Sequence, residues 1–205
     1  MDYVTLGRTE IKVCKNGFGA LPIQRISFDS AKEILLHAYN SGINFFDTAR
    51  FYTDSEEKIG YALSDVRDKI YIATKTAAQN ADDFWKDLNT SLNNMKTDYI
   101  DIYLMHRDNP MVDPGPMVEI LNEYHKAGRI GAFGGSNWTH QRIAEANAYA
   151  SKYGLVPFTV SSPNFGLCNQ IDDPWGGGPG CVTISGPANE EARAWYRDNH
   201  IPVLA

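Results

Sequence analysis

The chain has 205 residues, and its 43% apolar and 21% charged residues are close to the averages of folded globular proteins, which excludes a largely disordered chain. Its formal net charge of −6 argues against nucleic acid as the main partner. No apolar run approaches the roughly 20 residues that a membrane helix needs, and the first residues lack the basic start and apolar core of a signal peptide. We therefore expect a cytoplasmic protein with no membrane partner.

The cysteines Cys14, Cys168 and Cys181 are an odd and widely scattered set. Such a set is typical of free thiols in a reducing compartment. The sequence contains neither closely paired cysteines nor the HExxH pattern, which are common signatures of zinc sites. We therefore expect no metal site.

The chain opens with a predicted hairpin and then alternates strands with helices. Residues 3–14 indicate two short strands around a Gly-Arg-Thr turn, which would close the bottom of the domain. Residues 16–20 predict the first core strand and its tip. The first helix is predicted to follow Ser30, because Glu33 three residues later completes the spacing of a capping box, and to end at Gly42.

The same alternation continues to the end of the chain. Asp54, with Glu57 three residues later, predicts the start of the second helix. Apolar residues at helical spacing indicate the other helices, and short apolar runs indicate the other strands. The further strands are predicted at 43–46, 70–74, 99–105, 130–134, 158–161 and from 201, and the later helices along 84–95, 113–128, 139–153 and 189–199.

Strands that alternate with helices throughout predict an α/β fold with a parallel sheet. No order-reversing feature is visible, so a (β/α)8 barrel is favoured over a doubly wound sheet. About seven strands are present, whereas a complete barrel has eight and is typically about 250 residues long. We expect residues 1–205 to form a single α/β domain, a TIM barrel that is incomplete at the C-terminus and lacks its last strand and helices.

A loop from 163 to 187 is unusually long and rich in Gly and Pro. Loops of this length are functional or disordered in most proteins. Its Gly176–Gly180 run lacks the Lys-Ser/Thr of a phosphate-binding loop and the strand and helix that flank one. We interpret the run as a flexible lid over a ligand.

Four consecutive strands are predicted to end in polar, mostly ionisable residues, although the strand interiors are apolar. These strand ends are Asp47, Lys75, His106 and the pair Ser136-Asn137. The carboxyl ends of barrel strands converge on one rim, so the four ends are expected to share a pocket. Tyr52 follows the first of them by five residues and would add a phenol to the same pocket.

This combination suits proton delivery to a carbonyl oxygen. A phenol such as Tyr52 is a weak acid in water, and a lysine ammonium beside it would favour its ionised form. Asp47 would hold Lys75 charged and oriented, while His106 could hydrogen-bond the carbonyl of a substrate. None of these groups can supply a hydride, so a reductase would need a cofactor, and the Ser-Asn pair is suited to hold a carboxamide such as that of nicotinamide.

The order and spacing of these motifs resemble those of the aldo-keto reductases over essentially the whole chain. The matching motifs are Asp47-Thr-Ala-x-x-Tyr52, Ser55-Glu56, Ala73-Thr-Lys75, Leu104-Met-His106 and Gly135-Ser-Asn137. The resemblance implies a (β/α)8 barrel that reduces aldehydes or ketones with NAD(P)H, and oxidises alcohols in reverse. It implies NADP(H) as the cofactor, with NAD(H) as the alternative, and a small carbonyl compound as the substrate.

The resemblance also implies the roles of individual residues. It makes Tyr52 the general acid of a tetrad that is completed by Asp47, Lys75 and His106. The implied cofactor contacts are Gly19, Ala20, Leu21, Asp47, Ser136, Asn137 and Ser162.

The sequence departs from the family pattern in three places. Thr53 stands where a glycine usually follows the tyrosine, and Ser162-Pro163 stands where many members carry Gln-Pro. The family's last strands and the loop after strand eight, which supplies most contacts to the adenosine phosphate, are absent from these 205 residues.

Two alternatives to a reductase remain open. One is a non-catalytic barrel that binds the nicotinamide cofactor as a sensor or regulatory subunit. The other is an inactive, truncated fragment with exposed strand edges.

Two residues outside the rim have separate interpretations. Asp101 is interpreted as a buried structural group, and Trp138 is as readily structural as substrate-facing. The sequence does not specify the substrate or the oligomeric state.

Overall fold

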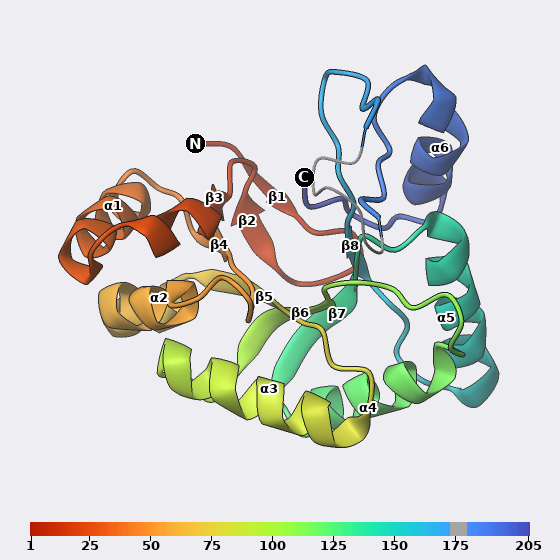
Figure 1. Cartoon of the computed structure of the whole chain (residues 1–205), viewed down its shortest axis with the longest axis horizontal. Helices are drawn as coiled ribbons and strands as arrows, with labels where there is room; N and C mark the ends of the chain where they lie inside the picture. Colours follow the sequence, from red (N-terminus) through yellow and green to blue (C-terminus); the bar gives the residue numbers. More distant parts are fainter. Residues whose placement is uncertain (173–179) are drawn as a thin grey trace.

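The computed structural model describes residues 1–172 and 180–205. Its centre is a six-stranded, all-parallel sheet whose strands follow one another in chain order. The sheet curls so that the helices line its outer side, and both termini lie at the open side of the curl (Figure 1). The strands of this sheet are β3 (Phe18–Gly19), β4 (Phe45–Asp47), β5 (Tyr71–Thr76), β6 (Ile100–Met105), β7 (Ile130–Ser136) and β8 (Val160–Ser162).

Helices connect the strands, as the sequence predicts. A separate antiparallel hairpin of β1 (Tyr3–Thr5) and β2 (Lys12–Cys14) precedes the sheet. The helical segments are η1 (Leu21–Arg25), α1 (Phe28–Asn40), α2 (Ser55–Leu63), η2 (Ser64–Lys69), α3 (Ala81–Met95), α4 (Gly115–Lys126), α5 (His140–Tyr153), η3 (Pro187–Asn189) and α6 (Glu190–Asp198).

The fold class is therefore confirmed as an incomplete barrel of the (β/α)8 type. The predicted strand from residue 201 is reduced to one bridge, in which Val203 pairs with Ser161 of β8. Within the described part of the chain, β3 pairs only with β4, so the two edges of the sheet do not meet. A cavity of about 240 Å³ lies between them and is lined by residues of β3, of the hairpin and of 203–205.

Alternation along the strands separates two apolar layers. Ile102 and Leu104 of β6 point into the barrel and pack with Leu6 and Val13 of the hairpin region, which covers the barrel's lower end. Tyr103, between the two in sequence, points outward into the layer between sheet and helices. Successive strand side chains face opposite ways, so one strand serves both layers.

The helix caps differ in part from the sequence prediction. Helix α1 begins after Ser27 rather than Ser30, because the Ser27 hydroxyl accepts a hydrogen bond from the Ser30 N–H at 3.2 Å. Asp54 precedes α2 as predicted, but its side chain makes no capping bond. Its carboxylate instead accepts a hydrogen bond from the buried Lys58 ammonium at 2.7 Å. Both helices are preceded by a residue type that commonly caps a helix, as predicted. Which side chain caps the helix, and which bonds elsewhere, depends on tertiary contacts.

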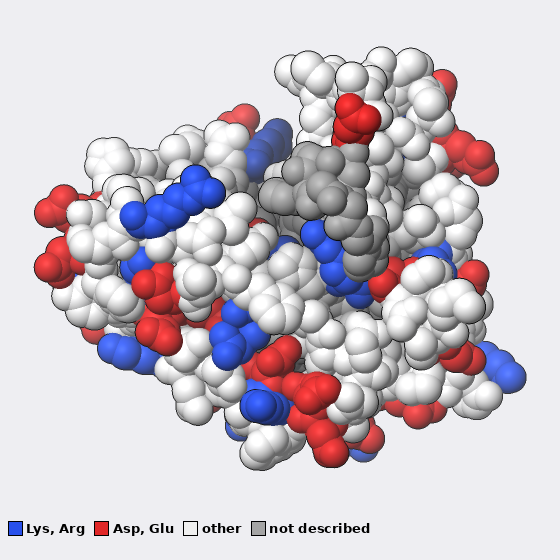
Figure 2. Space-filling view, viewed as in Figure 1, with Lys and Arg blue, Asp and Glu red and all other residues white. Residues whose placement is uncertain are grey.

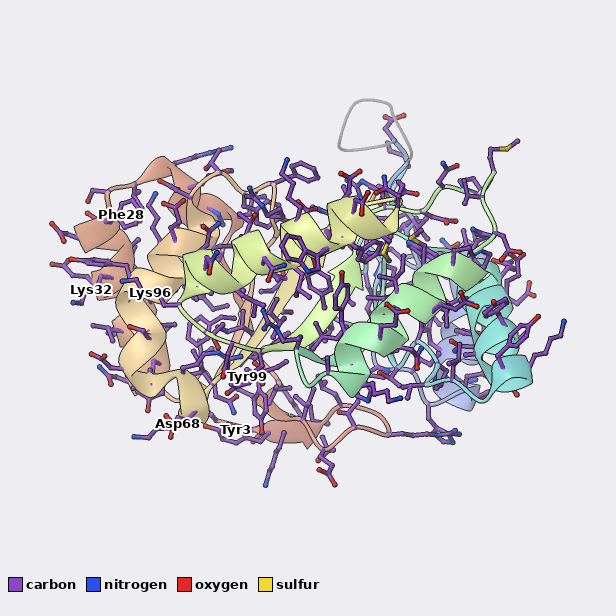
Figure 3. All side chains as sticks on the ribbon, turned by 90° about the horizontal axis from the view of Figure 1, so that it is seen from below. Tyr3, Phe28, Lys32, Asp68, Lys96 and Tyr99 are labelled. Carbon is purple, nitrogen blue, oxygen red and sulfur yellow. The ribbon has the colours of Figure 1, made fainter. Side chains whose placement is uncertain are left out.

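The end of the barrel opposite the strand tips contains a buried ion pair. Asp101 of β6 accepts hydrogen bonds from the Arg67 guanidinium at 2.7 Å and from the Ile72 N–H at 2.9 Å. Figure 3 shows the neighbouring Tyr99 near the hairpin, on the same side as Tyr3. The Asp101 side chain is thus hydrogen-bonded, as the sequence predicts, and about 10% exposed, while its structural role stays a prediction.

The Gly-rich run assigned to a lid lies largely outside the described residues, which resume at Gly180. In the described ranges, 1–172 and 180–205, no helix combines the length and apolar character required to cross a membrane.

Candidate functional site

Residues at the carboxyl ends of four neighbouring strands line one cavity of about 360 Å³. Parallel pairing brings them level, since Asp47 is in register with Ala73, and Thr76 with Met105. Tyr52 enters the same cavity from the loop after β4. The predicted residues that line it are Leu21, Asp47, Tyr52, Lys75, His106, Ser136, Asn137 and Ser162.

Lys75 is the most tightly held of these side chains. Its ammonium donates to both carboxylate oxygens of Asp47, at 2.8 and 2.7 Å, and to the carbonyl of Thr48 at 2.8 Å. Lys75 is only 3% exposed, whereas the Asp47 side chain keeps 30% of its surface in solvent. The pair is therefore asymmetric, with a buried cation and a partly hydrated anion.

Tyr52 lies beside this ion pair. The Lys75 ammonium is 5.4 Å from the centre of the phenol ring, and the His106 ring centre is 5.9 Å from it, edge to face. The backbone N–H of Tyr52 donates to the carbonyl of Ala49, which forms a tight turn. Thr53 follows with a φ of +40°, in the left-handed region where glycine is favoured. A glycine at this position would adopt the same backbone conformation without strain.

His106 directly follows β6 and is partly buried. Burial, together with the smaller effects of the positive charges of Lys75 and Arg107, lowers its pKa to about 4. The imidazole is therefore neutral at pH 7. A neutral imidazole can donate or accept a hydrogen bond but does not compete with the phenol as a cationic acid.

The Ser136-Asn137 pair closes the site on the β7 side. The Asn137 amide donates to the Ser136 hydroxyl at 3.1 Å and weakly to the His106 carbonyl at 3.5 Å. Its backbone N–H donates to the carbonyl of Ser162 at 3.1 Å. Among the described residues, the side-chain oxygen of Asn137 and the hydroxyl of Ser162 have no hydrogen-bond partner, and both residues line the cavity. Such a set of donors and acceptors fits a carboxamide.

The tip of β3 is arranged differently from the other predicted contacts. Gly19 lines the neighbouring 240 Å³ cavity, together with Asp47 and Ser162. Ala20 is fully buried, its N–H donates to the Asp47 carbonyl at 2.8 Å, and its carbonyl accepts from the Ser55 hydroxyl at 3.0 Å. Ala20 therefore fixes the strand tip against Asp47, and Leu21 is the residue that reaches the larger cavity.

The structure decides the role of Trp138, which the sequence left open, and adds Arg107 to the cavity. Trp138 is 2% exposed and packs on Phe158 with ring centres 5.3 Å apart, so its role is structural. Arg107 lines the cavity but was not singled out from the sequence, although it directly follows His106 at a strand end. The further lining residues from β8 onward are Pro163, Asn164, Phe165, Cys181, Leu204 and Ala205.

The family model for the aldo/keto reductase family matches residues 15–174 of this sequence. The chain belongs to the aldo/keto reductase family. The resemblance inferred from the motifs is thereby confirmed, and members of this family are, in general, carbonyl oxidoreductases that use a nicotinamide cofactor.

Relatives of this aldo/keto reductase carry two kinds of name. An aldo-keto reductase of Bacillus subtilis is 29% identical over 176 residues, which cover 77% of this chain and 53% of the relative. A 6-dehydroglucose reductase of Novosphingobium aromaticivorans is 32% identical over 61% of the chain and 47% of the relative. A probable voltage-gated potassium channel subunit beta of Oryza sativa is 28% identical over 83% of the chain and 57% of the relative. The chain thus spans about half the length of these relatives.

Proposed function

We propose that this protein reduces aldehydes or ketones to alcohols with a nicotinamide cofactor, NADPH in preference to NADH, and that Tyr52 is the proton donor. The observation that carries the proposal is the shared cavity in which the buried Lys75 ammonium is 2.7 Å from the Asp47 carboxylate and 5.4 Å from the centre of the Tyr52 ring. Proton transfer by a positioned side chain contributes about 10²–10⁴-fold to the rate.

The neutral His106 complements the phenol in this proposal. Its ring lies edge-on to Tyr52 at 5.9 Å between centres, so one carbonyl oxygen could approach both groups. His106 would donate a hydrogen bond that orients the carbonyl, and Tyr52 would pass its proton to the oxygen as negative charge develops there. Asp47 would keep the neighbouring ammonium charged throughout.

The nicotinamide cofactor, when bound, supplies the hydride. The residues of this chain fit its nicotinamide end, because Ser136, Asn137 and Ser162 offer hydroxyl and amide groups along one wall of the cavity. The cavity volume of about 360 Å³ lies within the usual range of ligand pockets, about 300–1,000 Å³. Ser136 and Asn137 would hold the carboxamide, and Leu21 would lie against the ring from the β3 side.

The test compares two Tyr→Phe variants of the chain. Cofactor oxidation is followed by the nicotinamide absorbance with a panel of aldehydes and ketones. Tyr52→Phe removes only the hydroxyl and is expected to lower kcat by about 10²-fold or more. Tyr61→Phe is the matched control, since Tyr61 is an exposed tyrosine of α2 whose hydroxyl donates to Asp29, outside the cavity, and it should keep the wild-type rate. A Tyr52→Phe variant with the wild-type kcat would refute the role of this phenol.

A second candidate is a regulatory barrel that binds the cofactor without turning over a substrate. The observation that favours it is the similarity to relatives named as probable potassium channel beta subunits, at 28% identity over 83% of the chain. Cofactor binding measured by nicotinamide fluorescence separates the two functions. Tight binding without oxidation by any carbonyl compound would support the regulatory function and exclude the reductase.

A further inference from the structure

We infer that Arg107 binds a carboxylate of the substrate, so that the carbonyl compounds reduced by this chain are oxoacids. The inference rests on the proposed reductase function and specifies its substrate class. Arg107 lines the same cavity as Tyr52 and His106, and it directly follows His106 in the chain.

The guanidinium of Arg107 has an unused donor. Its Nη1 atom is buried and has no hydrogen-bond partner within the described ranges of the chain. A buried donor without a partner costs about 1–3 kcal/mol, and more when the group is charged. A ligand that supplied an acceptor would remove this cost, and the two oxygens of a carboxylate match the N–H groups of a guanidinium.

The neighbouring acids are already engaged elsewhere. Asp108, the next residue, accepts hydrogen bonds from the Nε and Nη2 atoms of Arg142 at 2.9 and 3.1 Å. Asp47, the one acid among the described residues that line the cavity, is bound to Lys75 at 2.7 Å. Neither carboxylate is available to neutralise Arg107.

Among the described side chains that line the cavity, the charges therefore leave a positive excess. Lys75 and Asp47 neutralise each other, His106 is uncharged at pH 7, and Arg107 adds one positive charge. The chain as a whole carries a formal charge of −6. Figure 2 shows Lys and Arg side chains near the middle of the face that it draws, with Asp and Glu side chains both beside them and toward the outline. An anionic substrate is drawn to such a position, and a neutral one is not.

The position of Arg107 also limits how far the carboxylate of the substrate lies from its carbonyl group. His106 and Tyr52 are assigned to the carbonyl oxygen, and Arg107 is the adjacent residue in the chain. All three residues line one cavity of about 360 Å³, so a substrate that contacts them carries its carboxylate and its carbonyl group in one small molecule, as a short aliphatic oxoacid does. The reaction that produces this substrate must form an aldehyde or ketone on a small carboxylic acid.

The test compares charged and uncharged substrates that are otherwise alike. Glyoxylate and succinate semialdehyde are assayed with NADPH beside their methyl esters, which lack the negative charge. The wild-type chain is expected to prefer at least one acid over its ester by roughly 10- to 100-fold in kcat/KM, the range that a charge-assisted hydrogen bond supports. Arg107→Gln should abolish the preference by lowering kcat/KM for the acid while leaving the ester within about twofold. Arg107→Lys should retain part of it.

The control is Arg25→Gln, since Arg25 is an exposed arginine of η1 that does not line the cavity. It should leave both substrates unchanged, which separates a local contact from a general effect of net charge. Reduction of acids and esters at equal rates, or equal losses for both in Arg107→Gln, would overturn the inference and leave the proposed reductase intact.

A binding measurement keeps the test decisive if no carbonyl compound is turned over. Titration calorimetry of both acids into the chain with NADPH should give binding that is lost in Arg107→Gln and retained in Arg25→Gln. Binding of this kind without turnover would refute the reductase but support the carboxylate site. The absence of both binding and turnover would refute both.

Discussion

The ammonium of Lys75 lies 2.7 and 2.8 Å from the two carboxylate oxygens of Asp47, and only the lysine is fully buried. Removing the charge of Asp47 and removing the charge of Lys75 should therefore cost different amounts of stability. A lysine left alone would be a buried charge without its partner, whereas an aspartate left alone would still be partly hydrated. This asymmetry gives the first prediction.

Asp47→Asn is expected to destabilise the fold by about 3 kcal/mol, because it removes the negative charge that neutralises the buried ammonium of Lys75. Lys75→Met should cost less, since the Asp47 carboxylate remains 30% exposed to water. Urea unfolding of both variants and of the double variant measures the two losses and their coupling. If Lys75→Met lowers the free energy of unfolding more than Asp47→Asn does, Lys75 is not the more deeply buried residue of the pair.

His106 predicts a loss of stability in acid. Its pKa in the folded chain is about 4, below the 6.5 of an unfolded histidine, so the unfolded state binds the proton more readily. The free energy of unfolding should therefore fall as the pH drops from about 6.5 to about 4, by at most about 3 kcal/mol, with no further loss from this residue below that range.

The measurement compares urea unfolding of the wild type and of His106→Gln at several pH values. The variant should lack this component of the acid destabilisation, because glutamine does not titrate. His37→Gln is the matched control, since His37 is an exposed histidine of α1. If the two variants and the wild type lose stability in parallel, the imidazole of His106 is not buried as described.

Thr53→Gly should stabilise the chain. Thr53 has a φ of +40°, and a left-handed conformation costs a residue with a side chain about 1–2 kcal/mol relative to glycine. Glycine loses more backbone entropy on folding, so a net gain of about 0.5–1 kcal/mol is expected from thermal unfolding. Thr53→Ala keeps the strain and should show no such gain. An alanine variant as stable as the glycine variant would mean that the backbone is not strained here.

Asp101→Asn should reduce stability without changing the chemistry. The Asp101 carboxylate and the Arg67 guanidinium are each about 10% exposed, and the variant removes the negative charge that pairs with Arg67. A loss of about 2–3 kcal/mol in urea unfolding is expected, with kcat/KM of the folded protein unchanged. A selective loss of activity at full stability would place Asp101 in the site instead.

The sequence determined the alternation of strands and helices, since apolar runs and helical spacing depend on which face of each element is buried. It also determined the residues at the strand ends, because Asp47, Lys75 and His106 interrupt otherwise apolar strands. The hairpin before the sheet and the end of α1 at Gly42 were predictable for the same local reasons. Single caps were less predictable, since Ser27 and Ser30 are equally good candidates in sequence and only the fold selects one.

Tertiary structure decided which polar residues meet and with what consequence. No local pattern shows that Lys75 is buried against Asp47 and Thr48, or that the predicted seventh strand contributes only a bridge at Val203. The depressed pKa of His106 depends on burial by other segments of the chain. Within the described residues, the Nη1 atom of Arg107 has no partner, and its neighbour Asp108 is bound instead to Arg142 of α5, 34 residues away. Sequence thus fixes the residues that reach the rim, and packing over long distances along the chain fixes their charge, solvation and partners.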